Sequence, residues 1–147
     1  MKIKIGVFVC ILMLFVAPIL FAEDNRKEIP VEEAMEAFCG TWFYQIGASL
    51  EKVAYNHDGT WGAYYQKMET PAYTGTFKIE KAWKDSEGNI WLTQFSQLSN
   101  QQSWYFCKIS NNGTVWERAR LSNRDRLPTE IGPNDQRYMK AIRKKNE

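Results

Sequence analysis

The sequence has few of the side chains that most catalytic and metal sites require. Its 147 residues include one histidine and three cysteines. It contains no glycine-rich phosphate loop and no cluster of His, Cys, Asp or Glu at metal-ligand spacing. The histidine, His57, lies with Asp58 in a turn-like segment, and no nucleophile can be assigned to the pair. We therefore expect a protein that is not an enzyme and that uses no cofactor or metal.

The chain also lacks an excess of one charge. It has 19 Lys and Arg against 17 Asp and Glu, and two of the lysines, Lys2 and Lys4, precede residue 23. The remainder is electrically balanced. Proteins that bind nucleic acid through its phosphates need a basic surface, so this balance argues against such a partner.

The first 22 residues have the pattern of a secretory signal. Lys2 and Lys4 precede an apolar run from Ile5 to Phe21, and Ala22 follows it. The run is slightly short for a membrane span and contains Pro18, which favours cleavage. Retention as an N-terminal anchor is the alternative, and it would be the only expected membrane contact. We predict a signal peptide over 1–22 and one exported domain over 23–147, periplasmic or secreted, in a bacterium.

Export changes the interpretation of the cysteines. Without the first 22 residues, Cys39 and Cys107 remain. Two cysteines in an exported chain commonly pair, and a bridge closing so long a loop stabilises by roughly 4 kcal/mol in the chain-entropy account. We expect a disulfide between them. The alternative is a pair of buried free thiols.

Short helices are predicted at both ends of a β-rich region. Apolar residues at helical spacing predict one helix over 30–38 and another over 133–143. Between them, turn-forming sequences at 56–59, 84–89 and 111–113 separate segments rich in aromatic and β-branched residues. The predicted strands are 41–46, 50–56, 60–67, 73–83, 89–98, 102–110 and 113–121. Short connections between them indicate an antiparallel meander.

The start of the first strand resembles a known family. The tripeptide Gly40-Thr41-Trp42 after a short helix is similar to the Gly-x-Trp opening of lipocalins and related calycin barrels. The segment from Tyr55 to Trp61 also resembles short lipocalin-like bacterial domains. The resemblance implies a mainly β fold: an antiparallel meander closing into a small barrel of about seven to eight strands, with a short N-terminal and a C-terminal helix.

The same resemblance implies structural roles for particular residues. In the family, the tryptophan packs at the closed end of the barrel, and an arginine from the last strand lies across it. Gly40 and Trp42 match the opening motif. Arg118 and Arg120, in the last predicted strand, are the candidates for the arginine.

Aromatic residues are the most prominent compositional feature. All six tryptophans, all seven tyrosines and five phenylalanines lie after residue 22. They either fill a small core or line a cavity for an apolar or planar ligand. In 89–98, apolar on both faces, we place Trp91 and Phe95 inward rather than Ile90 and Leu92. The predicted ligand-binding residues are Tyr55, Tyr65, Phe77, Trp91, Phe95 and Tyr105.

Two functions from different classes follow. The leading one is non-enzymatic binding or carriage of a small hydrophobic ligand in the cell envelope. The alternative is a protein-binding module, such as an envelope inhibitor or assembly factor. It would have a filled core and would present an exposed aromatic face of 89–98 and 102–110 to its partner. An internal cavity favours the first, and a contiguous exposed patch favours the second.

Overall fold

The computed structural model describes residues 25–65 and 67–143, and the predicted signal peptide lies outside them. One helix and nine strands are formed within these residues. The elements are β1 (Lys27–Glu28), α1 (Val31–Phe38), β2 (Gly40–Ile46), β3 (Ser49–Tyr55), β4 (Thr60–Tyr64), β5 (Tyr73–Lys84), β6 (Ile90–Leu98), β7 (Gln101–Ser110), β8 (Val115–Arg120) and β9 (Met139–Ile142).

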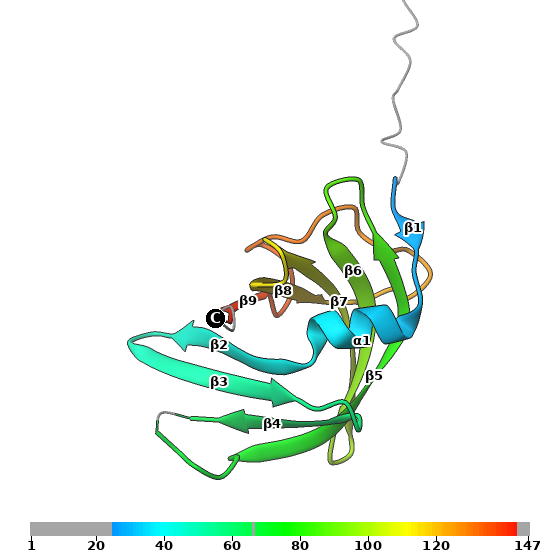
Figure 1. Ribbon diagram of the computed structural model, residues 1–147. Helices are drawn as coiled ribbons and strands as arrows, with labels where there is room; N and C mark the ends of the chain where they lie inside the picture. The colour runs from blue at the N-terminus through cyan, green and yellow to red at the C-terminus, as the bar shows by residue number, and fades with distance from the viewer. Residues whose placement is uncertain (1–24, 66, 144–147) are drawn as a thin grey trace, which may run out of the picture.

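Strands β2 to β9 form a closed antiparallel barrel. They follow the order β5-β4-β3-β2-β9-β8-β7-β6, and a direct pairing of β5 with β6 closes the ring (Figure 1). The predicted mainly β, antiparallel barrel is therefore confirmed, and each of the seven predicted strands is present. The two-residue strand β1 pairs with the end of β5.

Strand β5 bends so that one strand can serve two neighbours. It has 12 residues, pairs with β4 through its first part and with β6 along most of its length. Its register with β6 shifts between Ile79 and Lys81, which marks a β-bulge. An extra residue on one strand bends it and increases its twist, which helps a sheet to close.

The predicted C-terminal helix over 133–143 is wrong, because residues 133–137 form turns and a strand follows them. Met139–Ile142 is the strand β9, which pairs with β8 on one side and with β2 on the other. The apolar residues of this segment fit a helical spacing, but they also alternate. Ala141 is buried inside the barrel while Ile142 is exposed. Hydrogen bonds to two neighbouring strands outweigh the weak local preference for a helix.

The arginine across Trp42 is Arg143, not the expected Arg118 or Arg120. Its guanidinium carbon lies 4.5 Å from the centre of the Trp42 ring. Arg143 Nε donates to the carbonyl of Gly113 at 2.6 Å, while Nη1 and Nη2 donate to the carbonyls of Cys39 and Ala37 at 3.0 and 2.9 Å. Because β9 is the true last strand, the arginine that follows it takes this position.

Helix α1 closes the end of the barrel at which Trp42 lies (Figure 1). Its Phe38 is fully buried, and the ring centre lies 4.5 Å from that of Tyr55 and 5.6 Å from that of Trp116. Trp42 Nε1 donates to the Phe38 carbonyl at 2.8 Å. The tight turns at 56–59, 85–89 and 111–114 lie at the same end. The buried side chains that pack under α1 fill this half of the barrel interior.

Trp91 and Phe95 lie on the outside of the barrel, which corrects the inward placement. In β6 the inward residues are Leu92, Gln94 and Ser96, which stand opposite Cys107, Tyr105 and Ser103 of β7. The sequence could not decide this because the strand is apolar on both faces. A strand that is buried on both sides loses the alternation that normally reveals its orientation.

The outer face of β6 and β7 is covered by other parts of the chain. Trp91 stacks on Phe106 with 5.4 Å between ring centres, and the guanidinium of Arg26 lies over both rings. Trp104 packs against Phe95, and Arg124 of the connector 121–138 lies over Trp104 at 4.7 Å. The N-terminal segment and the connector thus explain why these strands are apolar on both sides.

Cys39 and Cys107 are buried free thiols, which corrects the predicted disulfide. Cys39 follows α1, and its backbone N–H donates to the Met35 carbonyl at 2.9 Å. Cys107 faces inward from β7, and its Sγ donates to Gln94 Oε1 at 3.6 Å. The two cysteines therefore lie in separate buried environments, as the alternative of two buried free thiols predicts.

We expect the contacts of Arg143 to be a major source of stability. Substitution Arg143→Met removes three charge-assisted hydrogen bonds and leaves their carbonyl acceptors without this donor, which should cost about 2–4 kcal/mol. Urea denaturation measures the change in the free energy of unfolding. Arg126→Met, at an exposed position of the connector, is the matched control and should change it by about 0.5 kcal/mol or less. Equal effects of the two substitutions would contradict this role.

The thiols should be inert in the native protein. Burial raises the pKa of Cys39 to about 11 and that of Cys107 to about 12. Near pH 8 neither should react with Ellman's reagent until urea unfolds the chain, and single serine variants assign each thiol. Reducing agent should leave the urea midpoint unchanged. Failure of the unfolded chain to react before reduction would indicate a bridge.

The raised thiol pKa values also make stability depend on pH. Because folding raises both pKa values, the free energy of unfolding should fall as the pH rises above the unfolded thiol pKa of about 8.5.

Candidate ligand cavity

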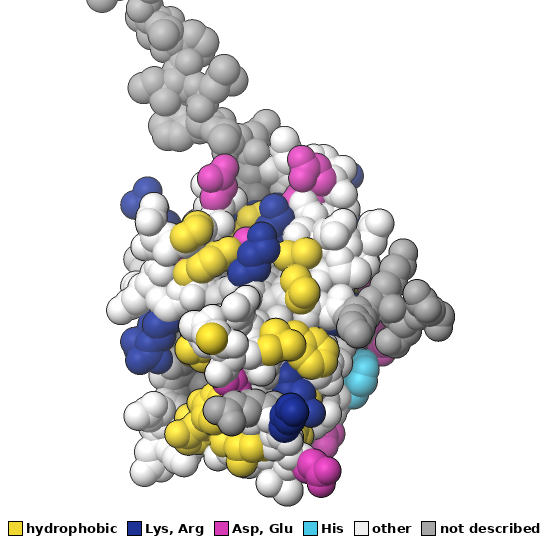
Figure 2. Space-filling model, turned by 90° about the vertical axis from the view of Figure 1, so that its left-hand side faces the viewer, with side chains coloured by type: hydrophobic (Ala, Val, Ile, Leu, Met, Phe, Trp, Pro, Cys, Tyr) yellow, Lys and Arg dark blue, Asp and Glu magenta, His cyan; other side chains and the backbone are white. Residues whose placement is uncertain are grey.

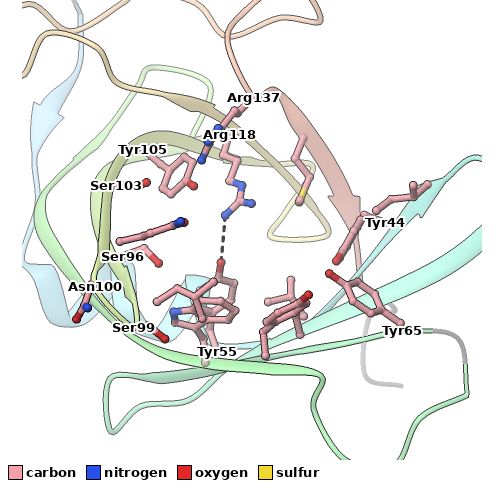
Figure 3. Close-up of a pocket in the computed structure, with 18 residues that line it drawn as sticks. Tyr44, Tyr55, Tyr65, Ser96, Ser99, Asn100, Ser103, Tyr105, Arg118 and Arg137 are labelled. Carbon is pink, nitrogen blue, oxygen red and sulfur yellow. Dashed lines mark hydrogen bonds between the residues drawn. The ribbon is translucent and has the colours of Figure 1, made fainter.

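A cavity of about 810 Å³ occupies the half of the barrel opposite α1. It lies where β2 meets β3, β4 meets β5 and β6 meets β7, and it is open to solvent there. Eighteen residues line it, and ten of them are labelled in Figure 3. Aromatic rings form much of the wall: Tyr44, Tyr55, Trp61, Tyr65, Tyr73 and Tyr105.

Alternation along the strands brings these rings together. Successive side chains of a strand point to opposite faces, so Tyr44 of β2 and Tyr55 of β3 face inward while their immediate neighbours do not. Tyr105 enters from β7, opposite Gln94 of β6. Tyr44 and Tyr65 lie together on one wall, and Ser96 and Tyr105 lie on the other (Figure 3).

One of the aromatic walls depends on a glycine. Gly75 of β5 pairs with Trp61 of β4, and a Cβ atom at position 75 would lie 2.7 Å from the Trp61 ring and 2.2 Å from the Gln97 carbonyl oxygen. The indole therefore lies flat across Gly75, where its Nε1 donates to the Thr76 carbonyl at 3.1 Å. Any larger side chain at this position would push the ring away from the wall.

Arg118 projects from β8 into the cavity (Figure 3). Its Nη1 lies 3.5 Å from the Tyr55 hydroxyl, and its guanidinium carbon lies 4.4 Å from the centre of the Tyr105 ring. Tyr55 is buried, and burial raises the pKa of its phenol, with Arg118 acting in the opposite direction. The Tyr55 phenol therefore stays protonated and orients the guanidinium without cancelling its charge.

The mouth of the cavity is apolar on one side and polar on the other. Exposed hydrophobic residues lie in or near the β2–β3 and β4–β5 connections: Ile46, Leu50, Tyr65, Met68 and Tyr73. Figure 2 views the molecule from this side and shows hydrophobic side chains interspersed with basic ones. The opposite side carries Ser99, Asn100 and Gln101 from the β6–β7 turn. Arg137 lies at the mouth as a second cation, and its backbone adopts φ 52, which is uncommon for a residue other than glycine.

The predicted ligand-binding residues fall into three groups. Tyr55, Tyr65 and Tyr105 line the cavity. Phe77 faces inward but lies below the cavity, packed against Phe38 and Tyr55. Trp91 and Phe95 lie on the outer surface of the barrel, as described above.

Sequence reasoning missed several lining residues. Tyr44 lies two residues after Trp42 and therefore points to the same side of its strand. Trp61 pairs with Tyr55 across the 56–59 turn, so it shares the inward direction of Tyr55. Both could have been found from the alternation and the turn. Arg118, expected over Trp42, lines the cavity instead. Arg137 lies in a connector without periodicity, and nothing in the sequence indicated its place.

Comparison with known proteins gives no family. The chain matches no protein-family model, no curated protein and no solved structure. Among the described residues, no group of three or more His, Cys, Asp or Glu is placed to hold a metal ion. Within the same residues, no helix has both the length and the apolar character needed to cross a membrane.

Phe77 and Tyr65 should differ sharply in their contribution to stability. Phe77 is 6% exposed and Tyr65 is 37% exposed. Phe77→Ala should lower the free energy of unfolding by about 3–5 kcal/mol because it leaves a void beneath the cavity. Tyr65→Ala removes a ring at the open mouth and should cost about 1 kcal/mol or less. Urea denaturation compares the two, and a similar loss in both variants would mean that the mouth is as tightly packed as the closed end.

Proposed function

We propose that this protein binds a small molecule with a largely apolar body inside the barrel, as a non-enzymatic carrier in the cell envelope. The observation that supports the proposal is the open cavity of about 810 Å³ with six aromatic rings on its wall. Pockets for small molecules usually have volumes of roughly 300–1,000 Å³ and mostly apolar walls with a few placed polar groups. An eight-stranded antiparallel barrel with an arginine across Trp42 also supports a lipocalin-like assignment.

The composition of the cavity wall favours binding over catalysis. Among the described residues that line the cavity there is no His, Cys, Asp or Glu, the side chains that most often serve as a general base. His57 lies outside the cavity, with its Nδ1 3.8 Å from Glu36 and both side chains exposed. What the lining can supply is apolar area, hydroxyl groups and the two guanidinium groups of Arg118 and Arg137. These are groups that hold and orient a ligand.

The alternative of a protein-binding module rested on the aromatic residues of 89–98 and 102–110. Arg26 lies over the outward rings Trp91 and Phe106, and Arg124 lies over Trp104. The chain therefore covers much of this face itself. The two-sided apolar pattern has an intramolecular cause and no longer favours a partner.

A neutral fluorescent probe tests the binding function. N-phenylnaphthylamine becomes brighter in an apolar site, and we expect it to bind the purified protein with one site per chain. Ala63 lines the cavity, so Ala63→Phe should weaken binding at least about tenfold by filling the space that the probe needs.

The matched control places the same ring on the outside. Ala54, in β3, lies between the inward residues Val53 and Tyr55 and therefore faces outward. Ala54→Phe should leave the affinity for the probe within about twofold. The proposal fails if the unaltered protein does not bind the probe, or if both variants bind it equally well.

A further inference from the structure

The two arginines on the cavity wall give it a positive charge. Arg118 and Arg137 line the cavity, and none of the described lining residues is acidic. The buried carboxylate of Glu51 is on the inward phase of β3, beside Tyr44 rather than beside Arg118. Within residues 25–65 and 67–143, no carboxylate oxygen lies within 4.0 Å of Arg118. It contacts the hydroxyl of Tyr55 and the rings of Tyr105 and Trp116, none of which is an acidic side chain. A cation held among neutral groups in a partly enclosed site attracts an anion more strongly than it would in open water.

Two other arginines of the chain, Arg124 and Arg143, also lie over aromatic rings and can be compared with Arg118. Arg124, on the outer surface, forms a salt bridge to Glu80 with 3.2 Å between Nη2 and Oε2. Arg143, at the closed end, donates to three backbone carbonyls. Of the three arginines, only Arg118 faces the cavity. Its one hydrogen-bond acceptor within the described part of the chain is the neutral hydroxyl of Tyr55.

Two buried side-chain nitrogens lie at or below the floor of the cavity. Arg118 Nε is buried and has no hydrogen-bond partner among the described residues. Gln94 is fully buried beside Tyr105 in the sheet and does not itself line the cavity; its amide lies near the Tyr55 hydroxyl, but its Nε2 makes no hydrogen bond of good geometry among the described residues. Gln94 Oε1 is already engaged by the Cys107 thiol. Buried donors need acceptors, and a carboxylate or sulfonate offers several on one group.

The walls above Arg118 suit a flat body better than a long flexible chain. Five tyrosines and Trp61 present ring faces and edges, and several of these rings carry hydroxyl groups. Ser96, Ser99, Asn100, Gln101 and Ser103 add polar groups along one side. Aromatic rings stack in offset or edge-on arrangements with one another, and a rigid ligand loses little conformational freedom on binding.

We propose that the ligand is a small aromatic anion, with its charged group bound by Arg118 at the floor and its ring system between the tyrosines. This proposal rests on the binding function proposed above and adds the chemical class of the ligand. The guanidinium offers parallel N–H donors that match the two oxygens of a carboxylate. Arg137 at the mouth adds a second positive charge along the path of an approaching anion.

A pair of matched competitors tests the charge. Naphthoate is an anion near pH 7, and naphthamide has almost the same shape without the charge. We expect naphthoate to displace N-phenylnaphthylamine from the unaltered protein at a concentration at least about tenfold lower than naphthamide requires. Equal displacement by the two competitors would overturn this proposal while leaving the binding of the neutral probe, and with it the proposed function, intact.

Substitution of Arg118 locates the effect. Arg118→Met should reduce the advantage of naphthoate over naphthamide to about twofold or less, because it removes the charge and the donors. Arg124→Met removes an arginine that packs on a ring outside the barrel and should keep the full advantage. Retention of the advantage in Arg118→Met would assign the anion to another site and overturn the proposal.

Two further comparisons keep the test decisive. Binding of the neutral probe shows whether each variant still has the cavity. If Arg118→Met no longer binds the probe, Arg118→Gln is used in its place.

Decanoate, an aliphatic anion, should displace the probe at least about threefold less effectively than naphthoate, because its flexible chain loses more conformational freedom and cannot stack. Displacement by decanoate as effective as that by naphthoate would overturn the aromatic assignment in favour of a lipid-like anion.

Discussion

The barrel depends on the closure made by its last strand and the arginine that follows it. Strand β9 fills the gap between β8 and β2, and Arg143 then reaches back to Gly113, Cys39 and Ala37. A single side chain thus joins the β7–β8 turn, the end of α1 and the start of β2. Burial lowers the pKa of Arg143, but three carbonyl acceptors and the Trp42 ring compensate for the desolvation of its charge.

This closure determines where the cavity can be. At the closed end, Phe38, Trp42 and Trp116 fill the interior, and each is fully buried. At the other end no helix formed by the described residues enters the barrel, and the lining mixes tyrosines and serines with a few apolar side chains around an open cavity. One small barrel therefore has a solid half that stabilises it and an open half that contains the cavity. Its aromatic residues fill the core of the first half and line the wall of the second.

Much of this fold could be predicted because its determinants are local. The turns at 56–59 and 85–89 are marked by Asp58 and Asp85, whose carboxylates accept backbone hydrogen bonds from residues just beyond them. Alternation predicted the inward phase of Tyr55 and Phe77. By contrast, β9 forms only because β2 and β8 lie on either side of it, and its four-residue pattern is equally compatible with a helix. The inward phase of β6 was hidden for a similar reason, since Arg26 and the connector cover its outer face.

The arginine assignment shows how one such error affects the view of the site. If 139–142 is read as a helix, the last strand is β8, and Arg118 or Arg120 is the candidate for the position over Trp42. Strand β9 gives that role to Arg143, and Arg118 instead lies inside the barrel in contact with Tyr55 and the rings of Tyr105 and Trp116. A guanidinium enclosed among Tyr55, Tyr105 and Trp116 is costly to desolvate unless an acceptor accompanies it. The proposed ligand class therefore rests on the residue whose place the local sequence pattern explains least well.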